Sequence, residues 1–200
     1  ESNEPDESGV VHAEEEQEAG IPEDFYYPQD HLEKRPRDSP ISSELCKFHW
    51  CAGFDENKRN NLYFLSNTEI IYAIGITYHV YNIETGEKQL FFGKDGKGIG
   101  ALTVHPQQTH FAVGEKGDWP NVYVFEYPSL KLYRILRKGT EKAFSTMSWS
   151  GSGKMLATVG SEPDFLLTVW DWKQEKIILK SKAFGQEVYR VTFSPKFEEE

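Results

Sequence analysis

The chain has 200 residues, a formal net charge of −10 and two cysteines. Two cysteines do not make the disulfide framework of a small secreted domain, and no apolar run approaches the length of a membrane span, so we expect a reducing, intracellular setting without membrane insertion. The first 30 residues hold 11 acidic residues and no Lys or Arg, which leaves 21 acidic and 22 basic residues in the remainder. That remainder carries no basic surplus of the kind a nucleic-acid surface needs, so we expect no nucleic-acid partner.

The N-terminal residues have the composition of a disordered tail. Residues 1–24 are rich in Glu with Ser, Gly and Pro and almost no bulky apolar groups, so they cannot bury enough surface to offset the entropy of ordering. Residues 35–40 follow as a charged, Pro-punctuated linker. We predict a disordered acidic tail and linker over 1–40 and a folded part over 41–200. The tail is either a solubilising segment, which we favour, or an acidic arm for a basic partner.

A repeat with a fixed period organises the folded part. Residues 166–172 read Leu-Leu-Thr-Val-Trp-Asp-Trp, a strand pattern that is largely apolar on both faces and therefore belongs between stacked sheets. The position of Asp171 recurs at Asn82 and Glu126, with spacings of 44 and 45 residues. A second marker, the turn after the first strand of each segment, begins at His105, Ser150 and Ser194, with spacings of 45 and 44 residues. Two markers with one period indicate four-stranded propeller blades.

The strand patterns place these blades along the chain. We predict an all-β WD40-type β-propeller fragment with blades at about 62–92, 100–136 and 143–179 and the start of the next at 187–195. The predicted strands of the first blade are 62–65, 70–74, 79–83 and 89–92, and those of the second are 101–104, 110–113, 122–125 and 130–136. The third blade includes strands at 155–160, 166–172 and 177–179, and the fourth opens with a strand at 188–193. Because the chain has no initiating Met and stops just after a new repeat begins, we expect it to be a piece of a longer protein.

The patterns that suggest catalysis or cofactor binding are incomplete. Cys46, His49 and Cys51 lie close together, but a zinc site needs four ligands and no second cluster follows. Residues 96–101 match a loose G-x-G-x-x-A nucleotide pattern, yet a strand follows where a helix is needed. His105 and His110 flank a turn and can face each other across a hairpin, but no Ser or Cys nucleophile lies in a recognisable elbow near them. We therefore predict no enzyme activity, no metal and no cofactor.

The loops at one end of the blades are the candidate binding surface. In a blade of four antiparallel strands a, b, c and d, the b–c and d–a loops lie at the same end. The b–c loops at 114–121 and 160–165 are longer than that of the first blade, and they carry Trp119 and Phe165 beside Pro120 and Pro163. Aromatic residues among charged loop residues suit a partner-binding surface, and we predict that Trp119, Pro120 and Phe165 contribute to it. The alternative is that both rings fold back and plug the end of the blade.

Several short stretches resemble the cilia- and flagella-associated WD-repeat proteins. They cover about residues 53–195 and consist of the following segments: Gly53-Phe54-Asp55, Lys58-Arg59-Asn60-Asn61-Leu62, Gly98-Ile99-Gly100, Val104-His105-Pro106, Val113-Gly114-Glu115-Lys116-Gly117, Glu126-Tyr127-Pro128-Ser129-Leu130, Gly139-Thr140-Glu141-Lys142, Lys182-Ala183-Phe184 and Gln186-Glu187-Val188. No Gly-His pair opens any blade, which leaves the side-chain network of standard WD repeats without its histidine.

This resemblance implies a large, non-enzymatic scaffold of the axoneme with downstream coiled coils. Its implied location is the cytoskeleton of the cilium or sperm flagellum, and its implied role is axoneme organisation and beating. The implied partners are a sister ciliary WD-repeat protein, an inner-arm dynein and the doublet microtubule. The alternative is a direct microtubule-binding propeller, as in the echinoderm-microtubule-associated proteins, although a binder of acidic tubulin needs a basic face and the folded part is nearly neutral.

Overall fold

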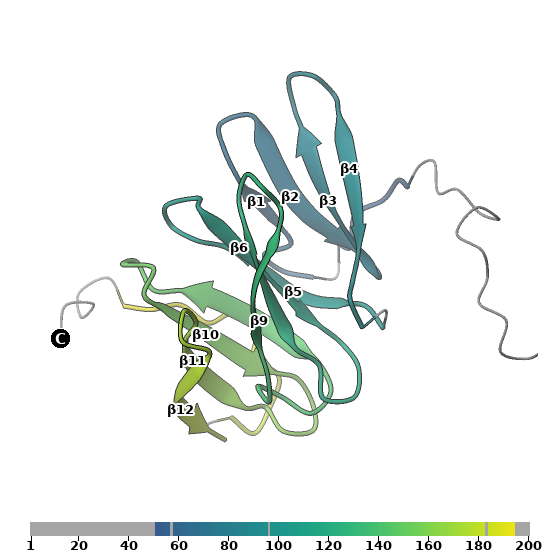
Figure 1. The fold of residues 1–200 in the computed structure, drawn as a ribbon. Helices are drawn as coiled ribbons and strands as arrows, with labels where there is room; N and C mark the ends of the chain where they lie inside the picture. The colour runs from purple at the N-terminus through teal and green to yellow at the C-terminus, as the bar shows by residue number, and fades with distance from the viewer. Residues whose placement is uncertain (1–50, 57, 96, 183, 195–200) are drawn as a thin grey trace, which may run out of the picture. The chain divides into compact units, whose positions relative to one another are not determined.

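The computed structural model describes residues 51–56, 58–95, 97–182 and 184–194 (Figure 1). The chain divides into two units, Glu1–Trp50 and Cys51–Glu200, and the described residues all belong to the second. The predicted acidic tail, the linker and the boundary between residues 40 and 41 lie outside the described residues and stay predictions.

The described residues form three four-stranded antiparallel sheets, as a propeller fragment requires. Each sheet is a meander in which consecutive strands are neighbours, and the described part of the chain contains strands and turns but no helix. Blade one consists of β1 (Leu62–Phe64), β2 (Glu69–Ile74), β3 (Thr77–Asn82) and β4 (Lys88–Phe92). Blade two consists of β5 (Ile99–Val104), β6 (His110–Glu115), β7 (Val122–Glu126) and β8 (Leu132–Leu136). Blade three consists of β9 (Phe144–Trp149), β10 (Met155–Gly160), β11 (Leu167–Asp171) and β12 (Lys176–Ser181). The predicted all-β propeller class is confirmed.

Burial on both faces explains why the middle strands read as continuous apolar runs. The residues of β6 from Phe111 to Glu115 and those of β7 from Val122 to Phe125 are all buried, because a sheet lies on each side of them. One apolar cluster, around Ile71, Tyr78 and Phe111, joins blades one and two. A second cluster, around Val124, Phe144 and Trp170, joins blades two and three. The core therefore lies between sheets, and no blade has a complete core of its own.

The tryptophans of the repeat signature occupy the second cluster. Trp170 is 1% exposed and Trp172 is fully buried. Trp170 lies in β11 and Trp172 directly after it, and both belong to the cluster between blades two and three, together with Leu136 and Phe144. The predicted position of Trp170 between blades is confirmed.

A close backbone approach joins blades two and three near their inner strands. A Cβ atom added at Gly100 in β5 would lie 2.4 Å from the carbonyl oxygen of Phe144 in β9. Close to this point, Lys116 and Ala143 form an isolated antiparallel bridge. Glycine is therefore required at this position, because no side chain fits between the two strands.

The strand predicted at 188–193 is not formed. Residues 187–194 have no strand pairing in the structure. A strand is stable only when a neighbour pairs with its backbone, and no second strand is described beside this segment. Its sequence has the residue preferences of a strand, but those preferences do not supply the partner.

Within the described residues, no helix is long and apolar enough to cross a bilayer.

Candidate partner-binding loop face

Four loops of blades two and three meet at one end of the sheets, as predicted. We call them the loop face: the d–a loops 93–98 and 137–143 and the b–c loops 116–121 and 161–166. Backbone hydrogen bonds join them in pairs. The amide of Lys116 donates to the Gly98 carbonyl at 2.8 Å, the amide of Trp119 donates to the Glu141 carbonyl at 2.8 Å, and that of Ser161 donates to the Ala143 carbonyl at 2.8 Å. The loops are therefore held in fixed positions relative to one another.

A buried carboxylate anchors the loop between blades one and two. Glu115, at the end of β6, is 1% exposed, and its two carboxylate oxygens accept hydrogen bonds from the amides of Lys94 at 2.5 Å and Asp95 at 2.7 Å. Burial raises the pKa of Glu115 above its usual range, and the two amide hydrogen bonds oppose that effect. The hydroxyl of Tyr123 extends the network by donating to Asp95 at 2.9 Å.

Blade three has a corresponding network built from different residues. Asp164 accepts hydrogen bonds from the Thr140 hydroxyl and the Glu141 amide, each at 3.0 Å. Deeper in the blade, the indole of Trp170 donates to the Thr158 hydroxyl at 3.1 Å. Thr140 follows Gly139 in the loop before β9, so a threonine hydroxyl from the d–a loop meets a carboxylate from the b–c loop here.

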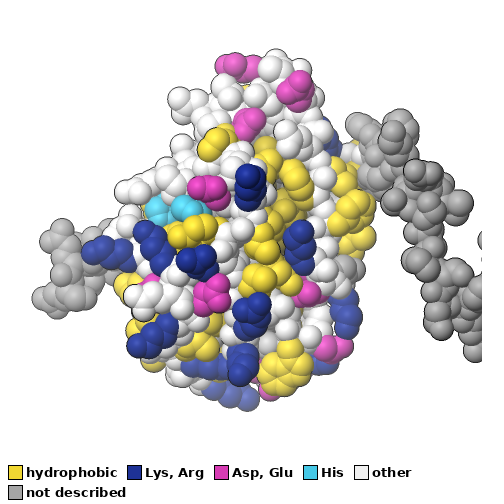
Figure 2. All heavy atoms as spheres, viewed as in Figure 1, with side chains coloured by type: hydrophobic (Ala, Val, Ile, Leu, Met, Phe, Trp, Pro, Cys, Tyr) yellow, Lys and Arg dark blue, Asp and Glu magenta, His cyan; other side chains and the backbone are white. Residues whose placement is uncertain are grey.

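A charged triad lies on the surface of these loops. Asp118 accepts hydrogen bonds from Lys142 at 2.6 Å and Lys97 at 2.7 Å, and all three side chains are more than half exposed. These bonds to Lys142 and Lys97 lower the pKa of Asp118 to about 2. Lys and Arg side chains gather at the lower end of the molecule (Figure 2), where the ribbon view shows the b–c and d–a loops. This end thus combines basic side chains with loops of fixed geometry.

The three predicted site residues lie on the loop face but differ in exposure. Trp119 is 62% exposed and adopts a left-handed backbone conformation with φ of 55°. Pro120 is buried, and Phe165, with φ of 44°, is half-buried. The ring of Trp119 therefore projects outward, whereas Phe165 is partly folded onto the blade. Their binding to a partner stays a prediction.

The histidines and cysteines considered above do not form a catalytic or metal-binding arrangement within the described residues. The His105 and His110 rings meet edge to face with centroids 6.0 Å apart, and both pack against Trp172. His105 is 5% exposed, and burial lowers its pKa. Cys46 and His49 lie outside the described residues. Among the described residues, no group of three or more His, Cys, Asp or Glu side chains is placed to hold a metal ion.

Sequence reasoning missed the two carboxylates that fix the loops. Glu115 directly follows the buried residues of β6, which suggested only a strand end, and Asp164 lies in the middle of a loop. Their positions are not equivalent within the repeat, so the period gives no signal for them. The sequence does contain one signal for Glu115, which is an acidic residue at the end of an apolar strand. A carboxylate buried there needs hydrogen-bond donors, so the pattern indicates that nearby backbone amides bind it.

Comparison with known proteins places the chain in a family. It is 38% identical to cilia- and flagella-associated protein 44 of Mus musculus over 98% of this chain, and 45% identical to the Chlamydomonas reinhardtii protein of that name over 73%. It is also 28% identical, over 78% of its length, to echinoderm microtubule-associated protein-like 2 of Rattus norvegicus. The same matches cover 11%, 9% and 26% of those relatives, so the chain spans about a tenth of the length of the first two. No family model matches the chain.

The protein named cilia- and flagella-associated protein 44 in Trypanosoma brucei brucei is 33% identical over 72% of this chain. Relatives of one name in three distant organisms therefore match most of this chain. Over the segment that it spans, the chain belongs to the cilia- and flagella-associated WD-repeat proteins.

Proposed function

We propose that the chain is part of a non-enzymatic scaffold of the motile cilium or sperm flagellum, located in the axoneme. In this proposal the scaffold helps to tether an inner-arm dynein to the doublet microtubule, together with a sister WD-repeat protein. The observation that carries the proposal is the similarity to proteins named as cilia- and flagella-associated in mouse, Chlamydomonas and Trypanosoma. The described residues support a scaffold role because the loops of the loop face are joined by backbone hydrogen bonds and so form a surface of fixed shape.

The loop face is the proposed contact surface. The Trp119 side chain is exposed, and its backbone amide is held by a hydrogen bond to the Glu141 carbonyl. The backbone of this loop therefore loses little further conformational entropy when a partner binds. Exposed aromatic anchors among charged residues are typical of binding hot spots. A partner that covers Trp119 would also meet the Lys97–Asp118–Lys142 triad.

The test is a double Trp119→Ala, Phe165→Ala variant of the full-length protein, expressed in ciliated cells. We expect it to fold but to lose its axonemal localisation and its co-purifying partners. The matched control is Leu132→Ala with Ile178→Ala, which removes two exposed apolar side chains on the outer strands β8 and β12. Normal localisation of the loop variant with the same partners would place the binding surface elsewhere.

Direct microtubule binding is the second candidate. It is favoured by the similarity to echinoderm microtubule-associated protein-like 2. Cosedimentation with bare doublets and with dynein-bearing doublets distinguishes the two. A scaffold whose binding requires dynein should cosediment only with the dynein-bearing doublets. A direct microtubule binder should cosediment equally with bare and dynein-bearing doublets and should be released by salt.

A further inference from the structure

A cavity of about 430 Å³ lies behind the loop face, between the inner strands of blades two and three and the segment that leads into blade one. Its walls come from Asp55, Lys58 and Arg59 before β1, from Gly100 and Lys116, and from residues 143–145, 161 and 187–189. Its size is within the range of sites that hold small ligands or single side chains of a partner. The loops 116–121 and 161–166 begin at its rim, so it lies directly next to the proposed contact surface.

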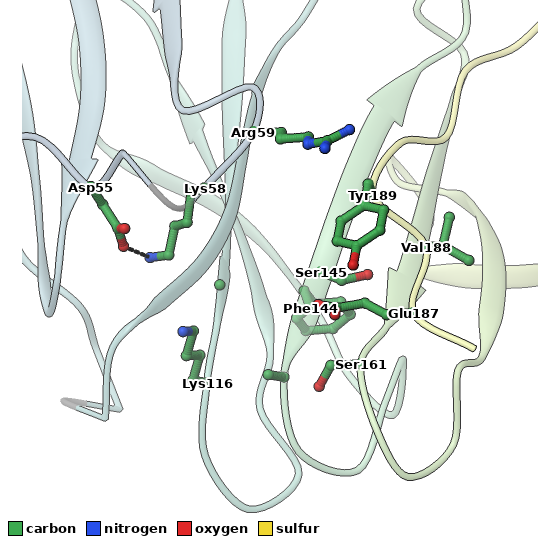
Figure 3. A pocket seen from close by; sticks show the side chains of 12 residues that line it. Asp55, Lys58, Arg59, Lys116, Phe144, Ser145, Ser161, Glu187, Val188 and Tyr189 are labelled. Atoms are coloured by element: carbon green, nitrogen blue, oxygen red, sulfur yellow. Dashed lines mark ion pairs between the residues drawn. The ribbon is translucent and has the colours of Figure 1, made fainter.

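The lining is rich in hydrogen-bond donors. Lys58, Arg59 and Lys116 contribute three cations, and Ser145, Ser161 and Tyr189 contribute hydroxyl groups. In Figure 3, Lys58 and Lys116 lie along one wall, Ser145, Ser161 and Tyr189 lie along the other, and Arg59 extends toward Tyr189. This arrangement suits a ligand that offers several acceptor oxygens.

The positive charges outnumber the carboxylates that neutralise them. Lys58 forms an ion pair with Asp55 at 3.2 Å and also donates to the Ile99 carbonyl. Arg59 lies over the Tyr189 ring, with its guanidinium carbon 4.8 Å from the centroid. Within the described residues, neither Arg59 nor Lys116 has a carboxylate within 4 Å, and Glu187 on the rim forms no ion pair. Two cations therefore face the cavity against one unpaired acid.

The electrostatics of Lys58 agree with this excess. Burial lowers the pKa of its ammonium group, and the nearby charge of Lys116 lowers it further, while Asp55 opposes both effects. The two ammonium groups thus repel each other at the rim. An anion placed between them would relieve that repulsion.

We propose that this cavity receives the carboxylate side chains of an acidic peptide segment of the partner, which pair with Arg59 at one end and Lys116 at the other and with the hydroxyl groups of the wall opposite Lys116. The inference rests on the proposed function for the partner itself, because it identifies the chemistry of the segment that would lie across the loop face. In this proposal the acidic segment gains specificity from charge pairing inside the cavity. The exposed ring of Trp119 anchors another part of the partner.

The test measures binding of a fluorescently labelled ten-residue polyglutamate peptide to the purified full-length protein by anisotropy. The double variant Arg59→Gln, Lys116→Gln should bind at least about tenfold more weakly, as loss of charge-assisted hydrogen bonds predicts. The control Lys131→Gln, Lys154→Gln removes the same charge from exposed positions outside the cavity and outside the loop face, and it should stay within about twofold of the natural protein. Equal losses in both variants, or binding unchanged in the first, would overturn the proposal.

Two further variants keep the result interpretable. Glu187→Gln removes the unpaired acid and should tighten peptide binding about two- to fivefold, a change of sign that a folding defect cannot produce. Unchanged or weaker binding there would count against the cavity. Trp119→Ala, Phe165→Ala should retain the short peptide, so loss of localisation with peptide binding intact separates a failed loop face from a failed cavity.

Discussion

The indole nitrogen of Trp170 in β11 donates a hydrogen bond to the hydroxyl of Thr158 in β10, at 3.1 Å and with both side chains buried. The two strands are hydrogen-bonded neighbours, and Thr158 is paired with Thr168 in their register. The bond therefore links side chains on the face of blade three that packs against blade two. It satisfies the one polar atom of a buried tryptophan in that interface, which explains how this side chain is accommodated there.

Truncation of Trp170 should destabilise the interface strongly. We expect Trp170→Ala to cost about 3–5 kcal/mol, because it deletes a buried aromatic side chain and leaves a cavity. Thr158→Val keeps the volume but leaves the indole N–H without an acceptor, at about 1–3 kcal/mol. Urea unfolding of the full-length protein, followed by tryptophan fluorescence, measures both. An unfolding midpoint that barely moves for Trp170→Ala would mean that the ring contributes little to blade packing.

Replacement of Glu115 should destabilise the loop between blades one and two. In Glu115→Gln, one acceptor oxygen becomes an NH₂ group directed at the amide of Lys94 or Asp95, so we expect a loss of about 1–3 kcal/mol. Hydrogen exchange of those two amides should accelerate at the same time. Glu162→Gln, at an exposed position of the loop face, is the matched control and should change neither. Slow exchange in the Glu115 variant would show that the carboxylate does not fix the loop.

A single methyl group at Gly100 should disturb the contact between blades two and three. Gly100→Ala brings a Cβ atom to 2.4 Å from the Phe144 carbonyl oxygen, and overpacking of this kind costs about 1–3 kcal/mol or more. Gly185→Ala is the control, because an added Cβ there meets nothing within 4 Å. Thermal melting of the two variants side by side gives the comparison. Equal melting temperatures would indicate that the strands separate at little cost.

Stability should fall as the solution is acidified below pH 6.5. His79 is fully buried, and burial, assisted by the charge of Lys88, lowers its pKa from 6.5 to about 4. Below pH 6.5 His79 is protonated in the unfolded chain but stays neutral in the folded chain. The contribution of neutral His79 to the free energy of unfolding is therefore complete above pH 6.5 and is lost as the pH falls toward 4. The shift corresponds to about 3 kcal/mol. His79→Phe preserves ring stacking on Tyr72 and should flatten the pH dependence over this range; an unchanged slope would exclude His79 as its source.

The fold could be predicted because its information is periodic. Blade spacing, the buried signature at Trp170 and the shared end of the b–c and d–a loops all follow from a repeat of 44 to 45 residues and from alternation within strands. The strand at 188–193 could not be excluded in this way, because residue preferences do not reveal whether a neighbouring strand is present to pair with it.

The candidate site was predictable only in part. Trp119 was found because an aromatic residue in a long charged loop stands out, but the sequence does not show that Trp119 projects outward while Phe165 is half-buried. Arg59 and Lys116 line the same cavity from positions 57 residues apart, and neither belongs to a repeated pattern. Such sites depend on how the blades stack, which periodicity alone does not encode.

The missing side chain at Gly100 also bears on how a propeller ring closes. In a propeller the blades are arranged around a central channel, and the innermost strand of each blade lies nearest to it. The bare backbone at Gly100 lets β5 and β9 come close together. A residue without a side chain therefore sets how closely the inner strands of blades two and three approach each other.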